Sequence, residues 1–157
     1  MGFLNNVYLL FFLFHIPTTI LIDSQGLIPR HLFPSWAVTL FDWHVAQNDD
    51  FLLRENRPWF KSLVYCECFI QLPFFFLASY AFLKKRNWIR IPALIYGVHV
   101  STTMAPILYE ILFGDNFSDK RYQLALIYAP YLAIPFMLSL SMAFSPYPFT
   151  KLKSKKQ

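Results

Sequence analysis

Residues 2–22 read GFLNNVYLLFFLFHIPTTILI, and none of these side chains carries a charge. About 20 apolar residues wound as an α-helix, rising 1.5 Å per residue, span a hydrocarbon core of about 30 Å. The run YLLFFLF at 8–14 shows no alternation of polar and apolar residues, which argues against a membrane barrel strand. A cleaved signal peptide is the alternative, but no basic residue precedes the apolar run and no small-residue cleavage site follows it. We therefore predict a retained membrane-spanning helix.

Three more stretches of the same kind follow along the chain. Glu67 alone interrupts the second, Glu110 alone interrupts the third, and the fourth carries no charge. Because lipid offers no water to unpaired backbone groups, only helices and closed barrels span it. We predict an all-α fold, an integral membrane four-helix bundle with spans near 4–22, 61–83, 89–113 and 122–144. Prolines inside these spans should kink the helices and open the bundle: Pro17, Pro73, Pro92, Pro106, Pro130 and Pro135.

The composition excludes a water-soluble monomer. Charged residues make up 15% of the chain, against about 25% in soluble domains, and hydrophobic residues make up 56%. With 4 glycines the chain has no glycine-rich phosphate loop, and we expect no nucleic-acid partner. Its 157 residues suffice for one domain, which we place at 1–150, followed by a basic tail at 151–157.

The distribution of Lys and Arg predicts the orientation. The N-terminus, the turn at 84–90 and the tail fall on one side, where basic residues are concentrated, so both termini should be cytoplasmic. In the tail, Lys153 and Lys155 resemble the Lys-x-Lys-x-x signal for retrieval to the endoplasmic reticulum, and we expect a multi-pass protein of that membrane. The simpler alternative is a basic tail attracted to anionic headgroups.

Two acids in the spans are the candidate functional groups. An ionisable group in hydrocarbon is a functional hypothesis by default, the alternative being a carboxyl without a role. Asp23 ends the first span, and Glu67 lies about 9 Å into the second span from the same membrane face. If these helices are neighbours, the carboxyls meet and share one proton, because both cannot ionise at low dielectric. Such a pair suits an amine, or an apolar ligand with one polar donor. Glu110 lies near the end of its span, and for this residue we favour the alternative, a carboxyl without a functional role.

Polar residues at helical spacing accompany these acids. Gln71 is four residues from Glu67, Thr103 is four from His99, and Tyr131 is three from Tyr128. Each pair is also explained by an interhelical hydrogen bond, which is the commoner case.

The segment 24–60 is predicted to hold a short interfacial helix. Trp36, Leu40 and Trp43 recur at helical spacing and form an apolar stripe suited to the membrane interface. This segment is also a candidate lid over the carboxyl pair.

Neither cysteines nor histidines form a metal-binding pattern. Cys66 and Cys68 point away from each other on a helix, so they cannot form a disulfide or share a metal ion. The four histidines are scattered, and none stands in a His-x-x-x-His pair. We therefore expect no metal and no cofactor.

Several strings along the chain are similar to the sigma-2 receptor (transmembrane protein 97) family of the EXPERA superfamily, relatives of the emopamil-binding sterol isomerases. They are HIP at 15–17, Asp23 with LIPR at 27–30, WFKS at 59–62, CE at 66–67, QLPFF at 71–75, YAFLK at 80–84, WIR at 88–90, His99 to Thr103 with Pro106, YAPY at 128–131 and IPF at 134–136. The resemblance implies a homodimer of the endoplasmic reticulum that binds sterols and hydrophobic amines, is tied to cholesterol homeostasis, and has a Niemann–Pick type C sterol transporter as a possible partner.

The same resemblance implies roles for particular residues. Asp23 corresponds to the carboxylate that pairs with a ligand amine, and Glu67 to its protonated partner. The implied pocket-wall residues are His15, Trp43, Phe60, Gln71, Thr103 and Tyr131. His44 departs from the family, which has a phenol at this position, and the loop before Arg121 is shorter than in the animal receptor.

Three function classes remain. A non-enzymatic binder of sterols and amines, which regulates sterol traffic, ranks first. A trafficking adaptor or chaperone with an incidental cavity ranks second. A sterol double-bond isomerase ranks third, because its acid and base must act on two ring carbons, whereas carboxyls that hydrogen-bond to each other are adjacent.

Overall fold

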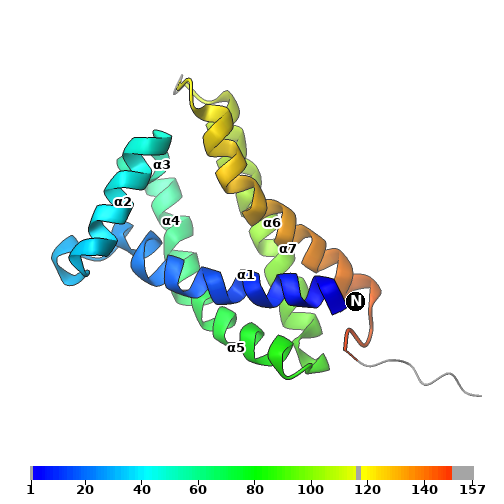
Figure 1. Ribbon diagram of the computed structural model, residues 1–157. Coiled ribbons are helices and arrows are strands. Elements are labelled where there is room, and N and C mark those ends of the chain that lie inside the picture. The colour runs from blue at the N-terminus through cyan, green and yellow to red at the C-terminus, as the bar shows by residue number, and fades with distance from the viewer. Residues whose placement is uncertain (1, 116–117, 150–157) are drawn as a thin grey trace, which may run out of the picture.

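The computed structural model describes residues 2–115 and 118–149, and every regular element in this part of the chain is a helix (Figure 1). The α-helices are α1 (Gly2–Leu21), α2 (Ser35–Asn48), α3 (Phe51–Glu55), α4 (Pro58–Cys66), α5 (Leu72–Leu83), α6 (Arg90–Phe113) and α7 (Arg121–Phe144). Short 3-10 helices cover η1 (Asp23–Gly26), η2 (Arg30–Leu32) and η4 (Asn87–Ile89), and η3 (Glu67–Gln71) is a π-helix. The tail with Lys153 and Lys155 lies outside the described residues.

Four helical segments are long and apolar enough to cross a membrane, which confirms the predicted fold class. They are Gly2–Gly26, Pro58–Leu83, Asn87–Phe113 and Arg121–Phe144. Many of their large apolar side chains face outward, among them Phe14 and Phe144, because lipid rather than water surrounds the bundle. The chain is a multi-pass membrane protein.

Helices α6 and α7 form an antiparallel pair (Figure 1). Their backbones approach closely at Gly97, where an added Cβ would lie 2.6 Å from the carbonyl oxygen of Pro135 and 2.8 Å from the Cβ of Ser139. Inside a membrane the hydrophobic effect does not draw helices together, because lipid is as apolar as their side chains. Small residues let the helix backbones approach closely enough for dispersion contacts to hold the helices together.

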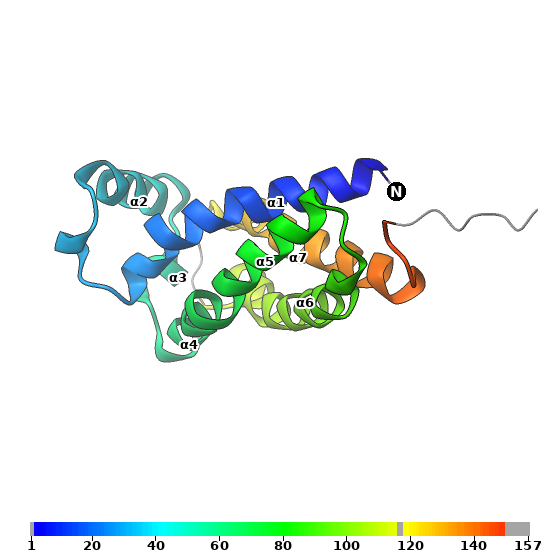
Figure 2. The same cartoon turned by 90° about the horizontal axis from the view of Figure 1, so that it is seen from below.

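Helix α1 packs along α5 on the other side of the bundle (Figure 2). Tyr8 and Phe12 are completely buried there, and Phe12 contacts the rings of Phe75 and Phe82. The Tyr8 hydroxyl lies 2.8 Å from Ser141 Oγ on α7, so its polar atom has a partner inside the bundle.

The N-terminus, the turn at 84–90 and residues 145–149 lie at one end of the bundle (Figures 1 and 2). The Phe149 backbone N–H donates to Asn87 Oδ1 at 3.0 Å, and Arg90 Nε donates to the Met142 carbonyl oxygen at 2.8 Å. This carbonyl lies in the last turn of α7, where carbonyl groups find no N–H donor within their own helix, and Arg90 supplies the missing donor. A chain that crosses the membrane four times in succession brings these three segments to the same side, so their position agrees with four spans.

The prolines act at fewer positions than predicted. Pro17, Pro106, Pro130 and Pro135 lie inside helices. Pro73 also lies inside a span, because α4, η3 and α5 follow one another without a break and Pro73 comes just after the π-helical turn. Pro92 differs, because it stands in the first turn of α6. In a first turn the missing N–H has no intrahelical acceptor to lose, so Pro92 starts a helix instead of bending it.

The segment between the first two spans folds into α2 and α3. The predicted stripe is present on α2, where Trp36, Leu40 and Trp43 are all exposed, the two tryptophans to 58% each. Ala37 and Phe41 of the same helix are buried. Helix α2 therefore carries the predicted apolar stripe on its exposed side and has apolar residues on its buried side as well.

Candidate functional site: a cavity with two carboxyls

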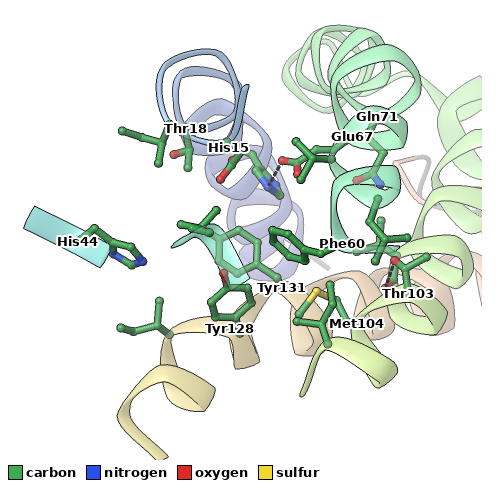
Figure 3. A pocket seen from close by; sticks show the side chains of 18 of the residues that line it. His15, Thr18, His44, Phe60, Glu67, Gln71, Thr103, Met104, Tyr128 and Tyr131 are labelled. Carbon is green, nitrogen blue, oxygen red and sulfur yellow. Dashed lines mark hydrogen bonds and ion pairs between the residues drawn. The ribbon is translucent and has the colours of Figure 1, made fainter. Parts of the chain in front are cut away.

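A cavity of about 380 Å³ lies among α1, α2, α4, α6, α7 and the π-helix η3. This volume falls within the roughly 300–1,000 Å³ typical of small-molecule sites. Figure 3 shows side chains from these elements converging on one space. All eight predicted ligand residues line it: His15, Asp23, Trp43, Phe60, Glu67, Gln71, Thr103 and Tyr131. The resemblance had named these residues from seven separate elements, Asp23 being on the turn η1, and the fold brings them together.

Glu67 reaches the cavity from a π-helical turn. The α-helical pattern of α4 ends at Cys66, and Glu67–Gln71 form one wider turn before α5 continues the span. Such insertions are rare and occur often at functional sites, since they redirect side chains within a helix. Glu67 Oε1 accepts a hydrogen bond from Thr19 Oγ1 at 2.7 Å and lies 3.4 Å from His15 Nε2, both residues on α1.

Asp23 occupies a turn that is fixed by neighbouring side chains. After α1 ends, Ser24 Oγ donates back to the Ile20 carbonyl oxygen at 2.7 Å, and Gln25 Nε2 donates to the Leu21 and Ala37 carbonyl oxygens. These bonds link the turn η1 to both α1 and α2, and so hold Asp23 at the cavity wall.

The two acids and one histidine form a compact cluster. One ligating atom from each of His15, Asp23 and Glu67 lies within 4.8 Å of the others. His15 is 7% exposed and stacks on the Phe75 ring at a centroid distance of 4.6 Å, which fixes its orientation. The two carboxyls thus lie near each other, as the depth argument predicted.

The rest of the wall is mainly aromatic and aliphatic. Phe60, Tyr128 and Tyr131 face the cavity together with Val100, Met104 and Ile107 of α6 (Figure 3). Neither Lys nor Arg occurs among the described residues that line it. An apolar cavity with carboxyls in its wall, and with neither Lys nor Arg in its described lining, is suited to a ligand with an apolar body and one positive or proton-donating group.

Asp50 is the residue that the sequence analysis missed. It is completely buried, and its Oδ1 caps α3 by accepting the Leu53 backbone N–H at 3.1 Å. Its Oδ2 accepts the Tyr128 hydroxyl at 2.9 Å and lies 3.1 Å from His44 Nε2. The capping position before the run FLLRE was the available signal, because Asp is a preferred N-cap. Asp50 lies outside the spans, whereas the prediction of functional acids rested on the cost of a carboxyl inside a span.

The hydrogen bonds around His44 fasten α2 onto α7. His44 Nδ1 lies 3.1 Å from Asn48 Nδ2, which can only donate, so Nδ1 accepts and Nε2 carries the proton given to Asp50. Asn48 Oδ1 in turn accepts from Gln123 Nε2 at 2.8 Å. The segment predicted as a lid is therefore tied to the bundle by buried polar groups, and its residues Leu40, Trp43, His44 and Leu53 line the cavity.

The outer side of this lid carries a surface ion pair. Asp49 accepts from Arg54 Nη1, and hydrogen bonds from Arg54 and Ser118 lower the pKa of the Asp49 carboxyl from its usual value. Asp49 is solvated, so this contact contributes little beside the buried Asp50 network.

Several other candidates lie away from the cavity. His99 does not line it, although Thr103 does, so the predicted pair is not a unit. Glu110 lies near the end of α6, 3.8 Å from Arg57. Cys66 and Cys68 are both free thiols.

The fold and the cavity define a helical membrane protein with a largely apolar cavity that carries two carboxyls in its wall. The family model described as EXPERA (EXPanded EBP superfamily) matches residues 36–142. The chain is 45% identical over 161 residues to sigma intracellular receptor 2 of Homo sapiens, covering 94% of this chain and 92% of that protein. The same receptor of Xenopus tropicalis is 44% identical over 153 residues, covering 91% and 90%. A more distant relative is efficient mitochondria targeting-associated protein 19 of Schizosaccharomyces pombe, 30% identical over 145 residues and covering 88% and 74%.

The chain belongs to the EXPERA family, and within it is similar to sigma intracellular receptor 2 over nearly its full length.

Proposed function

We propose that the protein is a non-enzymatic receptor of the endoplasmic reticulum membrane that binds sterols and hydrophobic cationic amines, and so regulates intracellular sterol homeostasis and trafficking. One observation carries the proposal: Asp23 and Glu67 lie together in the wall of an apolar cavity whose described lining has no Lys or Arg. A buried carboxylate without a counter-charge is costly, so a ligand cation placed beside it is stabilised strongly.

In the proposed complex, the Asp23 carboxylate pairs with the ligand ammonium. Glu67 keeps a proton, donates a hydrogen bond to Asp23, and is itself oriented by the Thr19 hydroxyl. The apolar body of the ligand lies against Phe60, Tyr131 and the aliphatic residues of α6. A sterol hydroxyl would take the place of the ammonium by donating to the same carboxylate.

The test is binding of a labelled hydrophobic amine to the purified full-length protein. Removing one partner of a buried charge pair costs about 3 kcal/mol or more, so Asp23→Asn should lower the affinity at least about 100-fold. The control is Asp42→Asn, the same chemical change at an exposed acid that pairs with Arg30 on the surface. Equal affinity of Asp23→Asn and the unmodified protein would contradict the proposal.

Sterol isomerisation is the second candidate, favoured by the acidic cluster in the cavity of an EXPERA protein. It needs a proton donor and a proton acceptor at two different ring carbons. The adjacency of Asp23 and Glu67 favours the receptor instead. Incubation of purified protein with an isomerisable sterol separates the two, because turnover that disappears in Glu67→Ala would establish the enzyme.

An adaptor role is favoured by the name of the yeast relatives, which refers to mitochondrial targeting. For an adaptor the cavity is incidental, so Asp23→Asn would leave partner capture unchanged. The family resemblance adds a homodimer and a Niemann–Pick type C sterol transporter as proposed partners. The pattern of the tail adds Lys153 and Lys155 as the proposed retrieval signal.

A further inference from the structure

The turn between α5 and α6 carries three adjacent cations, at the end of the bundle that lies away from the cavity (Figure 2). Lys84, Lys85 and Arg86 are all exposed, and none of them forms an ion pair with another described residue. The next basic residue, Arg90, is already engaged, because its guanidinium donates to carbonyl oxygens in the last turn of α7. The three charges of the turn are therefore available to a ligand.

No acidic residue of the chain belongs to this end of the bundle. The nine acids all fall at 23–67 and 110–119, which form the cavity wall, the lid and the turn between α6 and α7. The neighbouring segments at this end, the start of α1 and residues 145–149, have no charged side chain. Adjacent like charges without a counter-charge produce a positive field, so an anion beside them is stabilised.

The three cations stand where two membrane spans meet, beside exposed aromatic side chains. The span Pro58–Leu83 ends at this turn, and the span Asn87–Phe113 begins there. Tyr80 and Trp88 are each about half exposed. Rings of these two types are enriched at the membrane–water interface, the depth at which lipid headgroups lie. The cations are therefore placed at the level of the headgroup phosphates.

Lys85 has a backbone conformation that lysine rarely adopts. Its φ is 52°, and the Arg86 backbone N–H donates back to the Ala81 carbonyl oxygen at 2.8 Å to close α5. Glycine is the usual residue at this position, because a Cβ is strained in the left-handed region. The other described non-glycine residues with positive φ are Asp49 and Asn56, types that tolerate this conformation. The lysine therefore costs stability, and it supplies a charge that glycine lacks.

We propose that the turn at 84–86 binds the headgroup of an anionic phospholipid, whose acyl chains lie along the lipid-facing sides of α5 and α6. Three adjacent cations favour a headgroup with net negative charge over phosphatidylcholine, whose own ammonium they repel. A lipid fits better than a soluble anion, because the exposed Leu83 and Trp88 offer apolar contacts directly beside the charges. The orientation predicted from the Lys and Arg distribution places this end at the cytoplasmic leaflet, which holds the anionic lipids.

The test is a titration of the purified full-length protein in neutral detergent with fluorescently labelled phosphatidylserine, compared with labelled phosphatidylcholine of the same acyl chains. The unmodified protein should prefer phosphatidylserine. One Lys or Arg near an anionic surface strengthens binding about fivefold, so the joint change Lys84→Gln, Lys85→Gln and Arg86→Gln should weaken phosphatidylserine binding about 100-fold. Binding of phosphatidylcholine should not change.

The matched control removes the same number of charges from the tail, through Lys151→Gln, Lys153→Gln and Lys155→Gln together. This variant should keep the preference for phosphatidylserine. No preference in the unmodified protein, or an equal loss in the two triple variants, would overturn the proposal. Glycerophosphoserine, the same headgroup without acyl chains, should not displace the labelled lipid at equal concentration, and displacement would overturn the assignment to a lipid.

Lys85→Gly separates the loss of charge from the loss of structure. It should weaken phosphatidylserine binding about fivefold and yet raise the unfolding midpoint by about 2 °C, because glycine adopts a positive φ without strain. Lys85→Arg keeps the charge and should bind as the unmodified protein does. Equal affinity of Lys85→Gly and the unmodified protein would overturn the proposal. The turn lies outside the cavity, so all these variants should keep their amine affinity, and the proposed receptor function is tested independently.

Discussion

Replacing Asp50 by alanine should destabilise the protein more than any change at a surface acid. The buried carboxylate accepts from the Leu53 backbone N–H, the Tyr128 hydroxyl and His44 Nε2. Loss of an N-cap costs about 1 kcal/mol, and a buried hydroxyl left without its partner costs about 1–3 kcal/mol. His44 faces the cavity and can be hydrated there, so we assign it no further cost. The expected loss is about 3 kcal/mol.

The measurement is the thermal unfolding midpoint of the purified protein in detergent. For a chain of this length, 1 kcal/mol corresponds to about 2–4 °C, so Asp50→Ala should lower the midpoint by about 6–12 °C. Asp49→Ala is the matched control, because it makes the same change one residue earlier at a solvated carboxylate. It should shift the midpoint by about 2 °C or less. Similar shifts for the two variants would refute the reasoning that the Asp50 network holds the lid.

Three further outcomes are expected. Gly97→Ala should lower the unfolding midpoint, because the new Cβ would lie 2.6 Å from the Pro135 carbonyl oxygen. Gly26→Ala is the control and should leave the midpoint unchanged, because the atom nearest to its new Cβ would be 3.4 Å away. Glu67→Gln should keep most of the amine affinity, since an amide still donates a hydrogen bond, whereas Glu67→Ala should lose it; equal losses in a binding assay would argue against a shared proton. Because its pKa is lowered on folding, Asp49 stabilises the protein above its ordinary pKa of 3.8, and this contribution is lost as the pH falls. Unfolding midpoints of Asp49→Asn and the unmodified protein should therefore converge at low pH, and a constant difference would contradict this.

The four spans were predictable because they depend on composition over long stretches. Hydrocarbon excludes charged side chains and unpaired backbone groups wherever they stand, so the charge-free runs alone locate the spans. The neighbourhood of Asp23 and Glu67 was predictable for a related reason. Each residue of a helix advances a fixed distance along its axis, so the sequence position gives the depth of a side chain in the membrane.

The remaining parts of the site depend on tertiary contacts that no local pattern encodes. Asp50 accepts a hydrogen bond from Tyr128, which is 78 residues away along the chain. The π-helix at Glu67 inserts one wide turn into a run that reads as uninterrupted α-helix. His15 joins the carboxyls only because α1 packs beside η3.

The central claim is that a carboxylate in this cavity binds the charge of its ligand. The most direct measurement compares two ligands of the same shape, a hydrophobic amine and its analogue with carbon in place of the charged nitrogen, for binding to the unmodified protein and to Asp23→Asn. We predict that the unmodified protein prefers the amine by at least about 100-fold and that Asp23→Asn binds the two ligands equally. Equal affinity of the unmodified protein for both ligands would contradict the claim.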